Sequence, residues 1–151
     1  MGVLLTSVFL ISLMWSLLIS AQTLVRVINV QEPFDFACSV IKYDCADIPI
    51  PTIEVEPIGW AWGMFRHETP NTIYLDEQIV PYFDEVVLQS ILAHEMTHYL
   101  DFKRGVYDGT PGTVCATEWN GWRVSNAYYI THGRPDLADF NWAERYGCFR
   151  T

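Results

Sequence analysis

The sequence predicts one domain of the α+β class, in which a small mixed β-sheet packs on a central helix that is followed by C-terminal helices. Residues 52–56, 59–66 and 71–75 are short segments rich in β-branched and aromatic residues, separated by proline and polar turns, which is typical of strands. A long apolar segment with helix signals follows them, and two further helical segments come after it. Once an export segment is set aside, about 130 residues remain, enough for one core.

The strands are expected to bury their larger side chains. Alternation along residues 59–66 places tryptophan and methionine on one face and small residues on the other. We expect the face with Trp60 and Trp62 to be buried. The strand at residues 71–75 is expected to be the edge strand, where it could pair with an extended peptide.

The longest helix is expected to begin near Pro81 or Asp84 and to end at Gly105. At about 100° per residue its polar side chains form one narrow stripe, and apolar side chains occupy the rest of the circumference, which indicates a central helix. The stripe consists of Ser90, His94, Thr97, His98 and Asp101. Further helices are expected at residues 113–132 and 136–146, whereas residues 22–50 carry no clear pattern.

The chain begins with an apolar run. Residues 3–19 carry no charge and precede Ser20 and Ala21, small residues of the kind found before a processing site. We therefore expect residues 1–21 to be a signal peptide and residues 22–151 to be the folded domain. No Lys or Arg precedes the run, and Ile19 is not small, so an uncleaved N-terminal membrane anchor is the alternative.

The charge excludes some partners. The net charge is −9 and Lys and Arg form no cluster, so nucleic-acid binding is not expected, and any membrane contact is expected only through the N-terminal segment.

All four cysteines follow that segment, and an even number in an exported chain predicts two disulfides. Three pairings of Cys38, Cys45, Cys115 and Cys148 are possible. The short spacing of the first two favours a local loop, which leaves the other two to pair.

The central helix contains the motif His-Glu-Met-Thr-His at residues 94–98. Two histidines four residues apart differ by about 40° in azimuth and ~6 Å in rise, so both imidazoles can reach one metal ion. Glu95 then lies beside the ion, where it can accept a proton from a water molecule that the ion has made more acidic. A shuffled chain with four histidines and nine glutamates would contain this motif with a probability of only about 0.6%.

This motif and its setting resemble the zincin metallopeptidases over roughly residues 52–132. In that family, a strand antiparallel to the substrate precedes the helix, and a downstream residue supplies the third metal ligand. The metzincin extension is absent, because Asp101 stands at its glycine position and Arg104 at its final histidine. Gluzincins take a glutamate from the next helix, and Glu118 follows His98 by 20 residues.

The gluzincin resemblance implies Zn²⁺ bound by His94, His98 and Glu118, with Glu95 as general base and then general acid. The function it implies is zinc-dependent hydrolysis of peptide or protein substrates outside the cytoplasm. One alternative is a secreted binding module with a structural or vestigial metal site, closed by a fourth ligand such as a cysteine or His132. Another is a membrane-tethered structural protein without a metal.

The sequence departs from the gluzincin pattern at Trp122, which stands where the family has an aspartate that holds a ligand histidine. Asp101 or Asp76 could replace that aspartate, although an exposed capping role fits Asp101 equally. Tyr129 and His132 share a helix stripe with Glu118 but lie about 16 and 21 Å beyond it along the helix. We therefore expect packing or surface roles for both, and an exposed position for His67.

Overall fold

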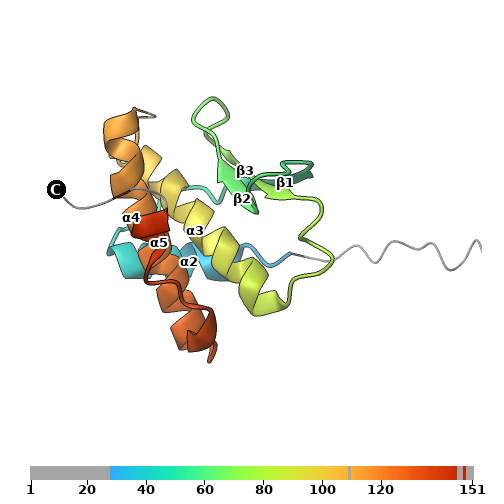
Figure 1. Cartoon of the computed structure of the whole chain (residues 1–151). Coiled ribbons are helices and arrows are strands. Elements are labelled where there is room, and N and C mark those ends of the chain that lie inside the picture. Colours follow the sequence, from blue (N-terminus) through green and yellow to red (C-terminus); the bar gives the residue numbers. More distant parts are fainter. Residues whose placement is uncertain (1–27, 109, 146–147, 149–151) are drawn as a thin grey trace, which may run out of the picture.

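The computed structural model describes residues 28–108, 110–145 and 148. The expected signal peptide or anchor at residues 1–21 lies outside the described residues. In chain order the elements are α2 (Gln31–Ile41), β1 (Thr52–Glu56), β2 (Gly63–Phe65), β3 (Thr72–Asp76), α3 (Glu85–Lys103), α4 (Pro111–Thr131), the 3-10 helix η1 (Pro135–Leu137) and α5 (Trp142–Arg145). Figure 1 shows α3 crossing the molecule between the small sheet and α4. The fold is thus α+β, with a mixed sheet and a central helix.

The three strands lie in the order β1-β3-β2. β1 pairs with β3 in parallel, and β2 pairs with β3 antiparallel, with Gly63 opposite Leu75 and Phe65 opposite Ile73. The prediction that residues 71–75 form the edge strand is therefore wrong. β3 takes the centre because it is the most apolar strand, with Ile73 and Leu75 fully buried. The edge strand that contacts α3 is β2.

The segment predicted as a strand at residues 59–66 is extended only over β2. The preceding residues turn instead, because the Asp76 carboxylate accepts the N–H groups of Ile58 (2.7 Å) and Gly59 (2.6 Å). Gly59 has a φ of +76°, which glycine adopts without strain. As a result Trp60 and Trp62 are exposed, at 78% and 56%, and the prediction that their face is buried is wrong.

Helix α3 begins as predicted at Asp84, whose side chain accepts the N–H of Val87 (2.9 Å) and caps the first turn. It ends at Lys103, just before Gly105, which has a φ of +70°. Every residue from 88 to 101 is buried, because α2, α4 and the sheet all contact this helix. Its polar stripe is therefore buried as well, including Asp101, which excludes the exposed capping role.

Helix α4 corresponds to the helix predicted at residues 113–132. The next prediction, a helix at residues 136–146, is wrong for most of its length, because η1 and the four-residue α5 take its place. The side chain of Asn126 explains the break. It accepts the N–H of Asp139 (2.8 Å) and donates to the C=O of the same residue (2.8 Å), so these backbone groups bond to α4 instead of continuing a helix.

Helix α2 arises in the segment that showed no pattern in the sequence, and it buries Phe34, Ala37 and Ile41 against α3 and α4. The disulfide between Cys38 and Cys45 closes its C-terminal end. A second disulfide joins Cys115 of α4 to Cys148. This is the pairing that the short spacing favoured, and two disulfides indicate an oxidising compartment.

The apolar core lies where α2, α3, α4 and the inner face of the sheet meet. Its largest fully buried side chains are Ile73, Leu75, Leu88, Leu92, Met96, Tyr99, Leu100, Val124 and, nearly so, Tyr128. Among the described residues, no helix is both long enough and apolar enough to cross a membrane.

Candidate metal centre

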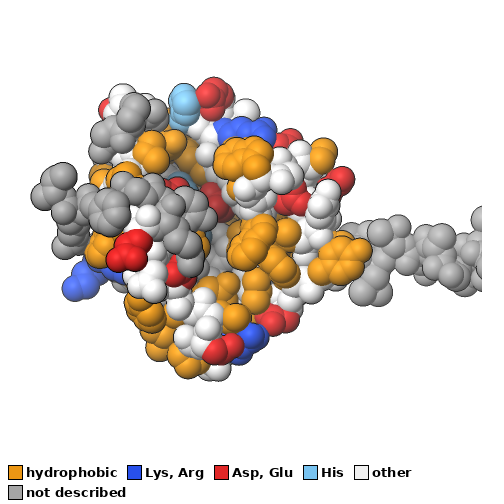
Figure 2. All heavy atoms as spheres, in the orientation of Figure 1, with side chains coloured by type: hydrophobic (Ala, Val, Ile, Leu, Met, Phe, Trp, Pro, Cys, Tyr) orange, Lys and Arg blue, Asp and Glu red, His pale blue; other side chains and the backbone are white. Residues whose placement is uncertain are grey.

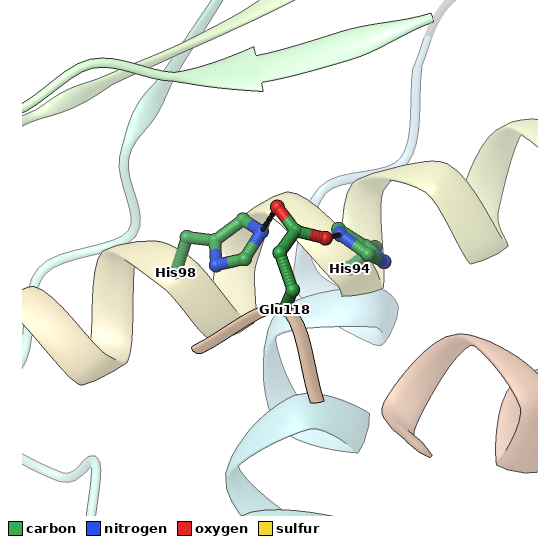
Figure 3. A group of neighbouring side chains, drawn as sticks. All are labelled: His94, His98 and Glu118. Atoms are coloured by element: carbon green, nitrogen blue, oxygen red, sulfur yellow. Dashed lines mark ion pairs between the residues drawn. The ribbon is translucent and has the colours of Figure 1, made fainter. Parts of the chain in front are cut away.

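His94, His98 and Glu118 converge where α3 and α4 cross. The two histidines lie one turn apart on α3, and their ring centroids are 4.8 Å apart. The Glu118 carboxylate reaches in from α4 and faces both rings, as Figure 3 shows. Its Oε2 lies 3.3 Å from Nε2 of His94 and its Oε1 lies 3.3 Å from Nε2 of His98. All three residues predicted as metal ligands are therefore brought together.

The spacing of these atoms fits a small metal ion. A tetrahedral site with metal–ligand bonds of about 2.1 Å has ligand atoms about 3.4 Å apart. The two nitrogen–oxygen distances of 3.3 Å are close to that spacing. One ligand atom from each of the three side chains can be chosen so that all lie within 4.8 Å of one another. This group could hold a metal ion.

The charges around His94, His98 and Glu118 also favour a bound cation. Burial by itself would raise the pKa of Glu118, but hydrogen bonds from His94 and His98 outweigh it and hold that pKa well below 4.5. Burial opposes charge on His98 too, yet the hydrogen bond to Glu118 and the charges of Glu95, Glu118 and Asp101 raise its pKa above 6.5. Without a metal ion, a proton provides the positive charge that the carboxylates favour. A divalent cation can replace it.

Glu95 lies beside the group without belonging to it. Its Oε2 accepts the backbone N–H of Phe65 in β2 (3.0 Å), which anchors the carboxylate to the edge of the sheet. Gly63 makes this approach possible, because a Cβ there would stand 2.8 Å from Cγ of Glu95 and 2.9 Å from Cγ2 of Ile91. The carboxylate is thus held between the edge strand and the metal ligands.

Gly121 sets the distance between α4 and His94. It lies one turn after Glu118, and a Cβ at this position would stand 2.8 Å from Nε2 of His94, the atom that faces the carboxylate. Real Cβ atoms do not approach other atoms so closely, so with a larger residue here either the His94 ring or α4 would have to move. Sequence analysis missed this residue, since a lone glycine within a helix has no distinctive pattern.

Among the described residues, no carboxylate takes the place of the aspartate that the sequence lacks at position 122 as an acceptor for His98. Nδ1 of His98 is buried without a hydrogen-bond partner. Asp76 accepts backbone N–H groups of the loop before β2, and Asp101 accepts from Asn120 of α4 (2.9 Å). Neither aspartate therefore serves as an acceptor for the ligand histidines. Trp122 instead packs edge-on against His94, with ring centroids 5.2 Å apart, and orients that imidazole by contact.

Tyr107 is a second residue that sequence analysis missed. The chain folds back after α3 because the C=O of Asp101 accepts the N–H groups of Val106 (2.8 Å) and Tyr107 (3.2 Å). The ring of Tyr107 thereby comes within 6.3 Å of His98 and 6.1 Å of Phe65, centroid to centroid. Burial, followed by the charge of Glu118, raises the pKa of Tyr107 above 10, so its hydroxyl stays protonated and can donate. No sequence pattern linked this loop residue to the motif.

The remaining candidate residues lie away from the metal group. His132 stacks on Tyr128, with centroids 3.9 Å apart, and its Nε2 lies 3.0 Å from Oε1 of Glu32. Tyr129 is buried near the end of α4, as expected for a packing role. His67 is half exposed beside Glu68. None of the three histidine and tyrosine side chains belongs to the group that could hold a metal.

Comparison of the chain with models of protein families, with curated proteins and with solved structures finds no match.

Proposed function

We propose that this protein is a zinc-dependent peptidase that acts outside the cytoplasm. One observation carries the proposal: two histidines and one glutamate converge closely enough to hold one metal ion, while a second glutamate is anchored beside them. Two imidazoles and one carboxylate are a ligand set that Zn²⁺ prefers and that catalytic zinc sites use. The resemblance to the gluzincins, stated above on the motif and on Glu118, supports the same reading.

Zinc held by His94, His98 and Glu118 would supply a Lewis acid that polarises a carbonyl and lowers the pKa of water. The chain supplies the proton transfers. Glu95 accepts the proton of the attacking water and then delivers it to the nitrogen of the departing amine. Its hydrogen bond from Phe65 fixes the carboxylate in one orientation, so that little ordering is needed during the reaction.

Tyr107 is positioned to stabilise the negative charge that develops on the carbonyl oxygen. Its ring lies beside His98, with centroids 6.3 Å apart, in the loop that follows α3. Its hydroxyl stays protonated, because burial raises its pKa, and it can therefore donate a hydrogen bond to a substrate oxygen. A neutral donor aimed at a developing oxyanion contributes more to the transition state than to the bound substrate.

Strand β2 offers backbone groups to an extended peptide. The N–H of Asp76 donates to the C=O of Trp62 (3.0 Å), so Trp62 and Met64 turn their backbone groups toward β3. Gly63 and Phe65 therefore turn theirs to the free edge, and the N–H of Phe65 there reaches Glu95. A peptide added as a further strand would lie with its backbone beside Glu95 and the metal ligands.

The alternative of a binding module with a structural metal site predicts a fourth protein ligand that closes the coordination sphere. Among the described residues, the group consists of three side chains, and all four cysteines are in disulfides. His132, the other residue considered as a fourth ligand, is stacked on Tyr128 instead. A three-ligand site that leaves a position for water favours the catalytic reading.

Replacement of Glu95 by Gln tests the proposal. The amide keeps the size of the side chain but cannot accept the proton, so hydrolysis should fall by about 10²- to 10⁴-fold, mainly in kcat. Zinc content, measured by elemental analysis, should remain at one equivalent in both proteins. The substrates would be a broad library of unstructured peptides, with products identified by mass spectrometry.

His94→Ala is the companion variant, because loss of a ligand should remove zinc and activity together. Wild-type protein that is loaded with zinc and cleaves no peptide in the library would refute the peptidase. Full hydrolysis by Glu95→Gln would leave a peptidase whose general base is another residue.

A further inference from the structure

Two tryptophans are exposed beside the proposed active site. Trp60 is 78% exposed and Trp62 is 56% exposed, although tryptophan is normally largely buried. In Figure 2, large apolar side chains lie open over the part of the molecule where Figure 1 places the sheet. Trp119 and Trp122, in contrast, pack against Trp142. Exposed apolar groups that gather in one place mark a site of interaction.

The loop that presents these tryptophans is firmly held. The Asp76 carboxylate accepts three backbone N–H groups, those of Ile58, Gly59 and Gln78, at 2.6 to 2.9 Å. The ring of Trp62 packs edge-on against Phe83, with centroids 5.1 Å apart. Beside the tryptophans lies a hollow of about 210 Å³, lined by Gly59, Trp60, Ala61, Trp62, Asp76, Gln78 and Ile79. Such a rigid surface binds without a large loss of conformational entropy.

This surface adjoins strand β2, which contacts Glu95. Trp62 precedes Gly63, whose backbone lies against Glu95. The free edge of β2 therefore lies beside the Glu95 carboxylate and begins directly after Trp62. A peptide paired antiparallel to β2 places the residues after its scissile bond beside the start of the strand, because antiparallel chains run in opposite directions. Those residues would reach Trp62 first and Trp60 next.

The lining of the hollow indicates the chemistry of its occupant. Asp76 is the one charged side chain among the lining residues, and backbone N–H groups already occupy both of its oxygens. That hydrogen bonding also holds the pKa of Asp76 below 3.8. These hydrogen bonds engage the carboxylate within the loop, and the most exposed apolar surface beside it consists of the rings of Trp60 and Trp62. Exposed aromatic faces favour contact with large apolar side chains.

We propose that Trp60, Trp62 and the hollow beside them form a subsite that selects peptides with large apolar or aromatic side chains after the scissile bond. The inference rests on the proposed peptidase activity and adds the substrate class. The bound peptide extends along β2, with its backbone on the strand edge and these side chains on the tryptophans.

The test compares zinc-loaded wild type with Trp60→Ser and Trp62→Ser on two matched peptide sets. One set has Phe, Leu or Trp at the two positions after the cleaved bond, and the other has Ala or Gly there. Loss of an aromatic contact should lower kcat/KM for the first set by about 10- to 100-fold, mainly through KM. Values for the second set should change by less than about threefold. The ratio of kcat/KM for the apolar set to kcat/KM for the small-residue set would then fall in the variants.

Ile130→Ser is the control, since Ile130 is an exposed apolar residue of α4 about 18 Å along the helix from Glu118. It should leave both peptide sets unaffected. Equal losses on both sets in the tryptophan variants would refute the subsite. So would a wild type that hydrolyses apolar and small-residue peptides equally well. Either result leaves the peptidase itself in place.

A binding measurement separates the two proposals. Zinc-loaded Glu95→Gln protein, alone and combined with Trp60→Ser, is titrated with the same peptides carrying a terminal fluorophore. Weaker binding of apolar peptides by the double variant supports the subsite even if wild type cleaves nothing. Equal binding by both proteins overturns it. A wild type that sediments as a dimer and becomes monomeric with Trp60→Ser would identify a second copy of this chain as the occupant and also overturn the proposal.

Discussion

Gly121 of α4 faces the imidazole of His94 so closely that a Cβ at this position would stand 2.8 Å from Nε2. The same helix carries Glu118 one turn earlier, with its carboxylate 3.3 Å from that nitrogen. The absence of one side chain thus lets α4 approach α3 closely enough for the glutamate to join the two histidines. Contact between helices, in addition to the spacing of the motif, determines whether the three ligands meet.

Gly121→Ala should therefore weaken zinc binding. Within a helix, alanine is normally more stable than glycine by about 1 kcal/mol, but here its methyl group must displace the His94 ring or the whole of α4. We expect zinc affinity to fall by about tenfold or more, as when other groups that orient a ligand histidine are removed. Competition with a chromophoric chelator measures it. Unchanged zinc affinity would show that the His94 ring or α4 can move to make room for the methyl group without weakening zinc binding.

Ala116→Gly is the matched control, because Ala116 is an exposed residue of the same helix. Its free energy of unfolding should fall by about 1 kcal/mol from the loss of helix propensity, while zinc affinity stays the same.

Glu118→Gln should lower zinc affinity by more than about 100-fold, because loss of a ligand costs more than loss of a group that merely supports one. The amide keeps the shape of the side chain but removes the charge that the two histidines partner. Glu144→Gln, on the exposed face of α5, should leave zinc affinity unchanged. Chelator competition at pH 7 compares them, and the reverse pattern would place the third ligand elsewhere.

Tyr107→Phe should reduce kcat by about 100-fold without changing KM or zinc content, since the variant loses one donor to the developing oxyanion and keeps the ring that packs near Phe65. Tyr82→Phe removes the hydroxyl of a tyrosine that is 83% exposed and should retain full activity. Steady-state kinetics on one good peptide substrate measures both variants. A tenfold rise in KM with unchanged kcat would instead assign Tyr107 to substrate binding.

The Asp76 carboxylate gives a pH-dependent contribution to stability. Its hydrogen bonds to the N–H groups of Gly59, Gln78 and Ile58 lower its pKa below 3.8 in the folded protein. Because the pKa of Asp76 is lower in the folded than in the unfolded protein, its ionised carboxylate adds to the free energy of unfolding. This stabilisation is complete at a pH above the pKa of the unfolded state and is lost as the pH falls through the pKa of the folded state. Asp76→Asn should thus be less stable than wild type at pH 7, and the difference should narrow below about pH 4.

Urea unfolding of both proteins between pH 7 and pH 2.5 measures this difference in the free energy of unfolding. A difference that stays constant over that range would mean that the charge of Asp76 does not hold the loop. The variant should also lose part of its preference for apolar peptides, because this loop carries Trp60.

Much of the metal centre could be predicted from local rules. Residues four apart on a helix share a face at any position in a protein, so the motif alone placed His94 and His98 side by side. Asp84 at the start of α3 and Gly105 after its end gave the limits of that helix through capping and a positive φ. Short separation likewise favoured the disulfide of Cys38 with Cys45.

The sequence was less informative wherever long-range contacts compete with local preference. Trp60 and Trp62 fit a strand pattern, yet the carboxylate of Asp76, 14 or more residues downstream, bends their segment into a loop and exposes both rings. Asn126 ends the last predicted helix in the same way, through bonds to a backbone 13 residues away. Propensity describes only neighbours along the chain, so it contains no information about such partners.

By itself, the sequence determined that His94 and His98 can bind one metal ion, because donor type and helical spacing are local properties, and the resemblance to gluzincins added Glu118. Only the tertiary structure decided what surrounds them. Strand β2 is the edge strand whose backbone binds Glu95, and Tyr107 lies beside His98. Gly121 allows α4 to lie close enough to His94 for Glu118 to reach both histidines. These relations join elements far apart in sequence. They depend on how closely two backbones can approach within one core, and that distance exists only after the chain has folded.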